Sequence, residues 1–271
     1  FSSLRTTKMP INIVDANNYF RRGFEAGKAV SQLAPQMNLD PTFYVFDGKF
    51  GTAKRKAIYP NYKAKRDTQT PMDNGFFTYL STIRTELLPF CYNAIIIQVD
   101  GYEADDVIAA LAIYFGQQQK HVLIHSNDAD FQALLNDYIT ITDRSKKLVH
   151  VAPQDIRLYK SLVGDSSDNI TGIPKLGNAW WLKLTEGDKN QWRQLLEGET
   201  DTYPASYLTE AKATWVENNV PLLRDFYTIV GFLPIDLHRV LTLDSDIGAN
   251  DPVEYRQTMT KYYWVWPLCD Q

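Results

Sequence analysis

The chain has 271 residues, a formal net charge of −4, an apolar fraction of 44% and an aromatic fraction of 13%. This composition excludes a disordered chain, and the length suits one large α/β domain or one domain with a smaller appendage. The two cysteines, Cys91 and Cys269, exclude a disulfide framework, so we expect a reducing, cytoplasmic setting. The sequence lacks a run of eighteen apolar residues and an N-terminal signal peptide, so we expect neither a membrane span nor export.

Apolar runs alternate with helix-like stretches in the first half of the chain. The runs predict strands at 11–14, 43–46, 95–99, 122–125 and 138–142, and the intervening stretches predict helices at about 17–34, 76–90, 104–116 and 129–136. This alternation is typical of parallel strands joined by right-handed crossovers. The sequence therefore predicts an α/β fold with a parallel central sheet and helices on both faces.

Acidic residues follow four of these apolar runs. They are Asp15, Asp47, Glu103, Asp105, Asp106, Asp128 and Asp130. Because the carboxyl ends of parallel strands line one crevice, we expect these side chains to converge. Two unit charges about 4 Å apart repel by about 4 kcal/mol at an effective dielectric near 20, so the cluster needs divalent cations or bound protons. Oxygen ligands favour Mg²⁺ or Mn²⁺.

Helix capping is the alternative explanation of these acids. An Asp after a strand is a common N-cap and turn former, and capping explains any single position equally well. Capping needs one acid per helix, however, and the stretches 103–106 and 128–130 each supply more than one. The set as a whole therefore indicates a metal site.

A basic strip follows the second predicted strand. It has seven cations and no acid: Lys49, Lys54, Arg55, Lys56, Lys63, Lys65 and Arg66. A solvated face is the ordinary explanation of such a run. Here Tyr59 and Tyr62 lie among the cations and offer rings on which bases stack, which favours nucleic-acid binding. A basic strip beside an acidic cleft is typical of an enzyme that acts on a polyanion.

The second half of the chain has a helical pattern from about residue 153, with Trp180, Trp181, Trp192 and Trp215 as predicted packing residues. Within it, Asp165 and Asp168 are three residues apart, which predicts two carboxylates on one face of a helical turn, able to address one metal.

Gly172 and Gly177 flank a turn ahead of a helix predicted to begin near Asn178, where backbone N–H groups could bind a phosphate. A capped helix followed by a Gly/Pro turn is the alternative, and it explains the turn residues but not the two aspartates.

These motifs resemble those of the 5′-nuclease family, which includes flap endonucleases, the 5′-3′ exonuclease domain of bacterial DNA polymerase I and free-standing phage 5′ nucleases. The resemblance runs from about Ile11 to Leu184. It rests on Ile13-Val14-Asp15, Phe46-Asp47-Gly48, Glu103-Ala104-Asp105-Asp106-Val107-Ile108, Asp128-Ala129-Asp130-Phe131 and Gly164-Asp165-Ser166-Ser167-Asp168-Asn169.

The resemblance implies a PIN-like nuclease core over 9–152, with a helical arch at about 49–75, and a helical region with a helix-three-turn-helix over 153–271. It implies two or more Mg²⁺ or Mn²⁺ ions held by nine acids: Asp15, Asp47, Glu103, Asp105, Asp106, Asp128, Asp130, Asp165 and Asp168. Lys63 and Arg66 would contact the scissile phosphate. The expected nucleic-acid contacts are Arg22, Lys54, Tyr62, Lys65, Gly172, Lys175 and Gly177, with a K⁺ ion at the helix-three-turn-helix.

Two departures from the family pattern affect the DNA contacts. The segment between Arg66 and Phe76 is short, which leaves open whether single strands thread through the arch or are clamped by it. The hairpin reads Pro174-Lys175-Leu176-Gly177 where relatives more often have an extra glycine, so duplex anchoring would depend on Lys175.

The sequence thus predicts a Mg²⁺-dependent 5′ nuclease that uses two metals to cleave DNA, and RNA in RNA–DNA hybrids, at or near 5′ ends and flap junctions. We expect a free-standing, phage-encoded monomer in a bacterial cytoplasm, with no membrane partner. Three alternatives stay open: a PIN-like endoribonuclease, a non-catalytic nucleic-acid-binding relative, and a metal-dependent phosphohydrolase of small phosphates.

Overall fold

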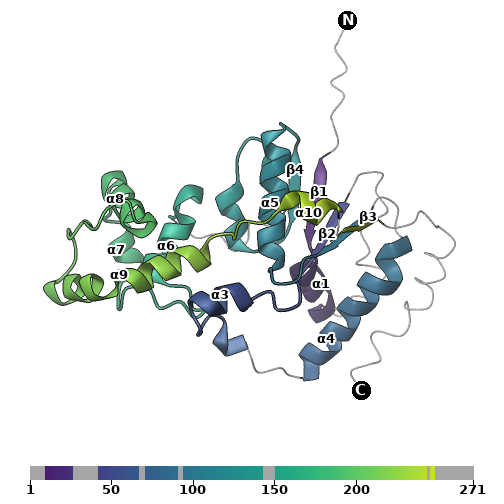
Figure 1. The fold of residues 1–271 in the computed structure, drawn as a ribbon, viewed down its shortest axis with the longest axis horizontal. Helices are drawn as coiled ribbons and strands as arrows, with labels where there is room; N and C mark the ends of the chain where they lie inside the picture. The colour runs from purple at the N-terminus through teal and green to yellow at the C-terminus, as the bar shows by residue number, and fades with distance from the viewer. Residues whose placement is uncertain are drawn as a thin grey trace, which may run out of the picture. The chain divides into compact units, whose positions relative to one another are not determined.

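A computed structural model describes residues 10–26, 42–66, 71–90, 94–142, 150–242 and 245–247 (Figure 1). The chain divides into two compact units, and both are discontinuous in sequence. The first contains Phe1–Gly51, Gln69–Lys146 and Pro234–Gln271, and the second contains Thr52–Thr68 and Lys147–Leu233. Each unit therefore depends on segments that lie far apart in the chain.

The first unit is built on a six-stranded sheet with the order β5-β4-β1-β2-β3-β6. Strands β1 to β5 run parallel, and β6 pairs with β3 in the antiparallel sense. The strands are Ile11–Asp15 (β1), Thr42–Phe46 (β2), Ala94–Gln98 (β3), Val122–His125 (β4), Ile139–Ile141 (β5) and Ser245–Ile247 (β6). The predicted α/β fold with a parallel central sheet is confirmed.

The central strands are buried on both faces, which explains why they are continuous apolar runs. One face packs with α1 (Ala16–Glu25) and α4 (Pro71–Thr82) in a core that includes Phe20, Tyr44 and Tyr79. The other face packs against α5 (Ala104–Gln117), where the rings of Phe43 and Phe115 lie 5.4 Å apart.

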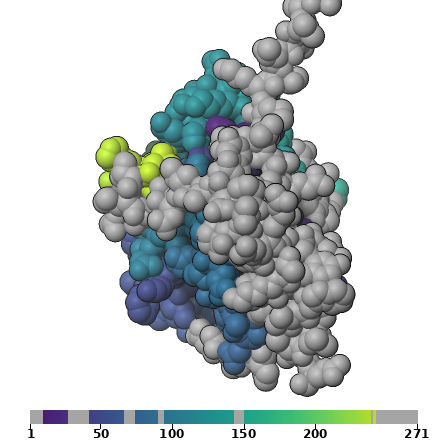
Figure 2. Space-filling view, turned by 90° about the vertical axis from the view of Figure 1, so that its right-hand side faces the viewer, coloured from purple at the N-terminus to yellow at the C-terminus, as the bar shows by residue number. Residues whose placement is uncertain are grey.

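Further helices of this unit extend or follow these elements. A π turn, Ile83–Leu87 (η2), and a 3₁₀ turn, Leu88–Phe90 (η3), continue α4. The helix predicted at 129–136 is a 3₁₀ helix, Ala129–Leu134 (η4). The helix α1 ends at Glu25 with Ala26 as its C-cap, and residues 27–34 of the helix predicted at 17–34 lie outside the described residues. A short helix, Leu237–Thr242 (α10), contacts α5, and this C-terminal part, yellow in Figure 2, lies on the surface of the unit.

The second unit is helical. It contains α3 (Ala53–Ile58), η1 (Ala64–Arg66), η5 (Pro153–Asp155), α6 (Ile156–Val163), α7 (Asn178–Trp181), α8 (Glu186–Glu197) and α9 (Glu210–Val230). Trp180, Trp181 and Trp192 are buried in its core, and Trp215 packs against them, as predicted from the sequence.

Arg55 joins the two segments of this second unit. Its side chain is buried on α3 and donates hydrogen bonds to the carbonyls of Ile229 (2.8 Å) and Gly231 (3.0 Å) at the end of α9. These bonds satisfy carbonyls that the helix leaves without a partner at its C-terminus. The segment 52–66 is thereby part of the second unit.

The sequence-based view of the C-terminal half needs one correction. The stretch from 153 was expected to be helical, but β6 adds a strand, because the backbone of Ser245–Ile247 completes the edge of β3. The compact units group 52–68 with the helices and 234–271 with the sheet, and the domains predicted from the sequence were 9–152 and 153–271. The domain boundaries and the arch at about 49–75 stay predictions. Within the described ranges, every helix is too short or too polar to span a bilayer.

Candidate metal centre

Asp15 and Asp128 lie at the carboxyl ends of the adjacent strands β1 and β4, where the strand order of the sheet reverses. Ser126 links them: its hydroxyl donates to Oδ2 of Asp15 (2.9 Å) and accepts from the backbone N–H of Asp128 (3.1 Å). The Ser126 side chain is fully buried. One hydroxyl therefore ties the Asp15 carboxylate to the backbone of Asp128.

The buried position of Asp15 makes its charge costly. Burial, the charge of Asp47 and, to a smaller degree, that of Asp128 raise the pKa of Asp15 from 3.8 to about 7. Hydrogen bonds from Ser126 and from the Asn18 N–H oppose this rise without cancelling it. The three strand ends thus bring like charges close enough to repel, which is the situation that a bound cation relieves.

Asp47 ties three elements together at the end of β2. Its Oδ1 accepts from the N–H of Ala104 (2.8 Å) at the start of α5, and its Oδ2 accepts from the side-chain amide of Asn17 on α1 (2.8 Å). The side chain of Gln98, at the end of β3, donates to the Asp47 carbonyl (2.7 Å). Asp47 therefore caps α5 from a different strand.

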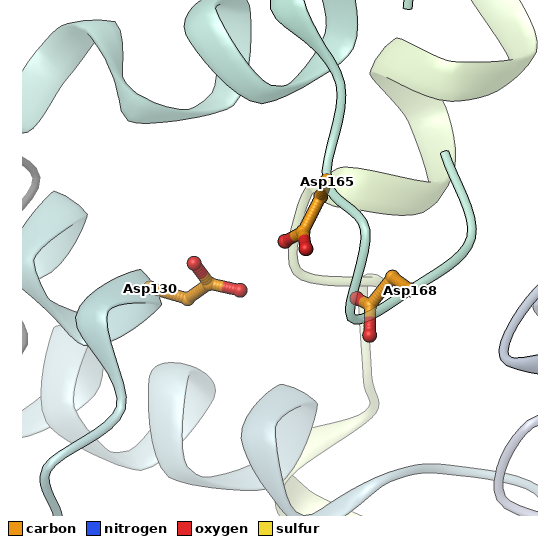
Figure 3. Close-up of side chains that lie close together, drawn as sticks. All are labelled: Asp130, Asp165 and Asp168. Atoms are coloured by element: carbon orange, nitrogen blue, oxygen red, sulfur yellow. The ribbon is translucent and has the colours of Figure 1, made fainter. Parts of the chain in front are cut away.

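The remaining acids of this unit surround the first turns of two helices. Glu103 is the N-cap residue of α5, but its side chain makes no capping hydrogen bond, and Asp105 and Asp106 lie in the first turn. Glu103 and Asp106 are buried. Asp128 caps η4 through the N–H of Asp130 (2.9 Å), and Figure 3 draws Asp130 at the start of that helix. Capping thus accounts for Asp15, Asp47 and Asp128, but not for the other four acids.

The sequence predicted Asp165 and Asp168 on one face of a helical turn. In the structure both lie on a loop of the second unit (Figure 3). Two 2.8 Å backbone hydrogen bonds between Asp165 and Ile170 close this loop as an antiparallel bridge. Gly164, at φ 103°, allows the chain to leave α6 in this direction, because a Cβ there would lie 2.8 Å from the Ile170 carbonyl. The loop still holds carboxylate oxygens of the two aspartates within 4.8 Å of each other.

Lys160 and Ser167 hold Asp165. The Lys160 Nζ lies 2.7 Å from Oδ2 of Asp165, and Ser167 donates to Oδ1 from its N–H (2.8 Å) and its hydroxyl (2.6 Å). Burial alone raises the pKa of Asp165, but the Lys160 charge and these hydrogen bonds outweigh it, so the pKa lies below 3.8. Asp165 is therefore an anion with a cation beside it.

Asp168 is held by the basic strip. Its carbonyl accepts from the Lys63 N–H (3.0 Å), its Oδ1 lies 3.9 Å from the Lys63 Nζ, and its Oδ2 accepts from the Tyr62 hydroxyl (3.4 Å). Asn169 adds a bond from its side-chain amide to the Asn61 carbonyl (2.9 Å). The predicted catalytic cation Lys63 thus lies beside a predicted metal ligand.

The aromatic rings of the strip differ from their expected role. Tyr62 is 2% exposed within the core of the second unit, and Tyr59 packs edge-on against Phe226. A buried ring cannot receive a base, so the stacking contact predicted at Tyr62 is wrong for this structure. The apolar bodies of these tyrosines serve the core.

The other residues predicted to contact nucleic acid or the scissile phosphate lie at the surface or have side chains outside the described residues. Lys54, Lys65 and Lys175 are exposed, and Arg22 is partly exposed. The backbone of Arg66 ends η1, but its side chain lies outside the described residues. Lys65 and the loop residues Asp165 and Ser166 line an open pocket of about 420 Å³. The catalytic, metal and nucleic-acid roles of all these residues stay predictions.

The turn directly ahead of α7 uses Gly172 and Gly177 differently. Gly172 has a φ of 58°, and a Cβ there would lie 2.6 Å from the Leu162 carbonyl, so only glycine fits. Gly177 precedes α7, and a Cβ there would meet no atom within 4 Å. The close packing of Gly172 is therefore a requirement of the fold, whereas Gly177 leaves open space at the surface.

Two residues of the site were missed in the sequence. Ser126 follows β4 directly, and its position at the carboxyl end of a strand was the sequence signal that could have marked it as a site residue. Lys160 is a buried lysine one turn before the end of α6, and only its spacing from Asp165 hinted at a partner. Both hold a carboxylate in place, and the arrangement of acids and cations suits hard divalent ions and phosphate.

Comparison with known proteins gives the family. The family described as "5'-3' exonuclease, N-terminal resolvase-like domain" matches residues 24–159. A 5′-3′ exonuclease of Mycoplasma genitalium is 33% identical over 239 residues, which cover 77% of this chain and 78% of that protein. The chain belongs to the 5′-3′ exonuclease family. The matched region includes Asp47, Lys63 and Asp128 and ends before the loop that carries Asp165.

Relatives differ in how much of their length is matched. A DNA polymerase I of Caldicellulosiruptor bescii is 32% identical over 154 residues, which cover 51% of this chain and only 18% of the polymerase. A structure of bacteriophage T5 5′-exonuclease with zinc ions shares the fold, with a TM-score of 0.66, 19% identity and coverage of 94% of this chain and 98% of that chain. A T5 flap endonuclease with DNA and metal ions gives a TM-score of 0.61, 18% identity and the same coverage.

The raised pKa of Asp15 predicts a gain in stability when its charge is removed. Its folded pKa of about 7 exceeds the ordinary 3.8, so its contribution to stability is full below about pH 4 and is lost as the pH rises to about 7. In EDTA at pH 8, Asp15→Asn should therefore raise the free energy of unfolding by roughly 1–3 kcal/mol, while keeping an acceptor for the Asn18 N–H. Thermal melts at pH 8 and pH 4 check this, with the gain absent at the lower pH. A variant less stable than wild type at pH 8 would contradict a costly charge at Asp15.

The Lys160 contact predicts a change in metal affinity. Because the ammonium 2.7 Å from Asp165 repels a second cation, Lys160→Met should strengthen the weakest Mn²⁺ binding roughly three- to tenfold and lower the Tm in EDTA. Titration of free Mn²⁺ by electron paramagnetic resonance, without nucleic acid, measures the first effect. The matched control is Lys183→Met, an exposed lysine of the same unit. Unchanged Mn²⁺ binding in the Lys160 variant would remove Asp165 from the metal ligands.

Proposed function

We propose that this chain is a divalent-metal-dependent 5′ nuclease that hydrolyses phosphodiester bonds at or near the 5′ ends and 5′-flap junctions of DNA. One observation carries the proposal: in a member of the 5′-3′ exonuclease family, Asp15, Asp47 and Asp128 stand at three neighbouring strand ends, near enough to raise the pKa of Asp15 to about 7. Such a set of oxygen ligands fits hard divalent ions.

The acids of each unit would bind metal ions in this proposal. Asp15, Asp47, Glu103, Asp105, Asp106, Asp128 and Asp130 would hold metal at the end of the sheet, and Asp165 and Asp168 would hold metal on their loop. Bound metals would lower the pKa of a water that attacks the phosphate and would stabilise the leaving 3′ oxygen. Ser126, Asn17 and Lys160 keep the carboxylates oriented, so little reorganisation is needed when metal and substrate arrive.

Lys63 would act on the substrate phosphate. Its ammonium lies 3.9 Å from Asp168 and its side chain is 12% exposed, so it is held in place but can still reach a ligand. A fixed cation at this position would offset the negative charge that grows on the phosphoryl oxygens, with Arg66 as its partner. The positive φ of Lys63, 53°, and its N–H bond to Asp168 hold its backbone in one conformation.

Binding of the nucleic acid would use the exposed cations. Lys54, Lys65 and Arg22 would contact phosphates of the strand being cut. Lys175, at φ 58° on the turn before α7, and the N–H groups around Gly172 and Gly177 would hold the duplex. The same turn would take K⁺, and Mg²⁺ or Mn²⁺ would be the catalytic ions. RNA–DNA hybrids as additional substrates, a monomeric state and a cytoplasmic location belong to the same proposal.

A substrate panel with Asp128→Asn tests the nuclease activity. Asn retains the cap on η4, so the fold persists, but one anionic ligand is lost. With Mg²⁺, wild type should cleave a 5′-flap duplex, and Asp128→Asn should be slower by about a hundredfold or more, the scale of losing one preorganised group at a phosphoryl centre. Its DNA affinity in EDTA should be equal or higher, because a repelling charge is gone. Asp137→Asn, an exposed acid of the same unit, is the control.

The other outcomes of this panel distinguish the alternatives. Cleavage of single-stranded RNA without any preference for 5′ ends would favour an endoribonuclease. Hydrolysis of a small phosphomonoester alone would favour a phosphohydrolase. Binding of DNA without metal-dependent cleavage of any substrate would favour a non-catalytic relative.

A second experiment separates catalysis by Lys63 from simple attraction. A cation that acts mainly in the transition state changes the rate of the chemical step more than the affinity. Lys63→Ala should therefore slow single-turnover cleavage by about a hundredfold, with a much smaller change in Kd. Lys54→Ala, exposed on α3, should mainly weaken binding. Equal losses of affinity alone in both variants would reduce Lys63 to one phosphate contact among several.

A further inference from the structure

Phe50 is the most exposed of the large apolar side chains that stand out on the described surface, with 82% of it accessible. The others range from Ile58 at 36% to Leu182 at 56%. Burial of a phenyl ring is favourable, so a ring that is mostly in water has apolar area left to bury against a ligand.

The backbone under Phe50 is strained as well. Its φ is 56°, in the left-handed region that non-glycine residues rarely adopt. Two other positions of this turn, Gly48 and Gly51, are glycines, yet the position with the positive φ carries a phenylalanine. Strain held at one residue is a reason to look for function there.

The turn is rigid. Gly48 donates to the Tyr102 carbonyl (3.0 Å), and Gly101 donates to the Lys49 carbonyl (2.8 Å). The packing is so close that a Cβ on Gly48 would lie 1.8 Å from the Val99 carbonyl oxygen.

Further bonds hold the two ends of the same turn. The Lys49 N–H donates to Oδ1 of Asp100 (3.0 Å), and the Gly51 N–H donates to the Gly48 carbonyl (3.1 Å). The exposed ring is thus presented from a fixed base, so little conformational entropy would be lost when a flat ligand packs on it.

The surroundings indicate which ligand would pack there. Phe50 follows Asp47, a predicted metal ligand, by three residues, and Lys49 is its neighbour in the chain. The basic strip 49–66 predicts phosphates along this stretch, and its two tyrosine rings are turned into the core. Among the described aromatic residues of the strip, Phe50 is the one whose ring is in solvent.

We propose that Phe50 is a stacking platform for an unpaired nucleobase of the strand whose phosphate is cleaved. This inference rests on the proposed function and adds a contact to the base, where the cations contact only phosphates. Stacking on an aromatic face tolerates any base, so the contact would favour single-stranded or flapped substrates over blunt duplexes without reading sequence.

The test uses oligonucleotides that carry 2-aminopurine, whose fluorescence falls when the base stacks. Binding is measured with Ca²⁺ in place of Mg²⁺, on single strands and 5′ flaps with the probe moved one nucleotide at a time. Wild type should quench the probe at one position, and Phe50→Ala should abolish that quenching and raise Kd about tenfold for unpaired substrates. Phe50→Trp should retain both properties, and Phe50→Leu, which is apolar but has no ring, should behave like Phe50→Ala.

Three controls make the result specific. Phe77→Ala, an exposed aromatic on α4, should leave binding unchanged. An abasic nucleotide at the quenched position should remove the difference between wild type and Phe50→Ala, and the salt dependence of Kd should be equal in both, because no phosphate contact is lost. Phe50→Gly should raise the Tm, since glycine relieves the positive φ, and should still bind weakly.

Two results would overturn the proposal: Phe50→Leu that binds and quenches like wild type, or wild type that quenches no probe. Either can occur in a protein that still cleaves flaps with Mg²⁺, so the inference about Phe50 can fail while the proposed nuclease activity stands. If wild type bound no nucleic acid at all, both would fail together.

Discussion

Repulsion between buried carboxylates is the constraint on which the first unit depends. Asp15 is shielded from water at the end of β1, with the charges of Asp47 and Asp128 close by, and its pKa of about 7 expresses the cost. A protein that needed only stability would place apolar or neutral residues at these strand ends. The sheet keeps the acids together because parallel strands bring their carboxyl ends to one edge, so the geometry that makes the fold also concentrates the charge.

Neutral polar groups make this arrangement tolerable. Ser126, after β4, and Asn17 and Asn18, both on α1, each donate a hydrogen bond to one of the carboxylates, and the first turn of α5 donates to Asp47. In the second unit the solution is different, because Lys160 places a full positive charge beside Asp165. Asp15 is therefore held by hydroxyl and amide donors, whereas Asp165 is held by a cation of the chain itself.

Periodicity and strand-end chemistry allowed much of this to be predicted from the sequence. The parallel sheet followed from the alternation of apolar runs with helices, and the acids at the ends of β1, β2 and β4 followed from the sheet.

What could not be predicted depends on packing between distant segments. Tyr62 lies among cations in the sequence, which is typical of a surface residue, but its ring is buried because the second unit packs 52–68 onto its helices. The loop of Asp165 looks helical by spacing, but the bridge to Ile170 and the positive φ of Gly164 decide its shape. The exposure of the Phe50 ring and its positive φ could not be predicted, because neither property has a sequence signal.

The hydrogen bonds of Arg55 constrain the order in which parts of the chain can fold during synthesis. Its guanidinium is buried, and its acceptors lie 174 and 176 residues further along, at Ile229 and Gly231. During synthesis the early segment of the second unit is made long before the carbonyls that it binds, and the whole sheet segment 69–146 emerges in between. The helical unit can therefore reach its native packing only after the residues up to Gly231 have left the ribosome, and a nascent chain cut short before residue 229 would leave the Arg55 guanidinium without these two acceptors.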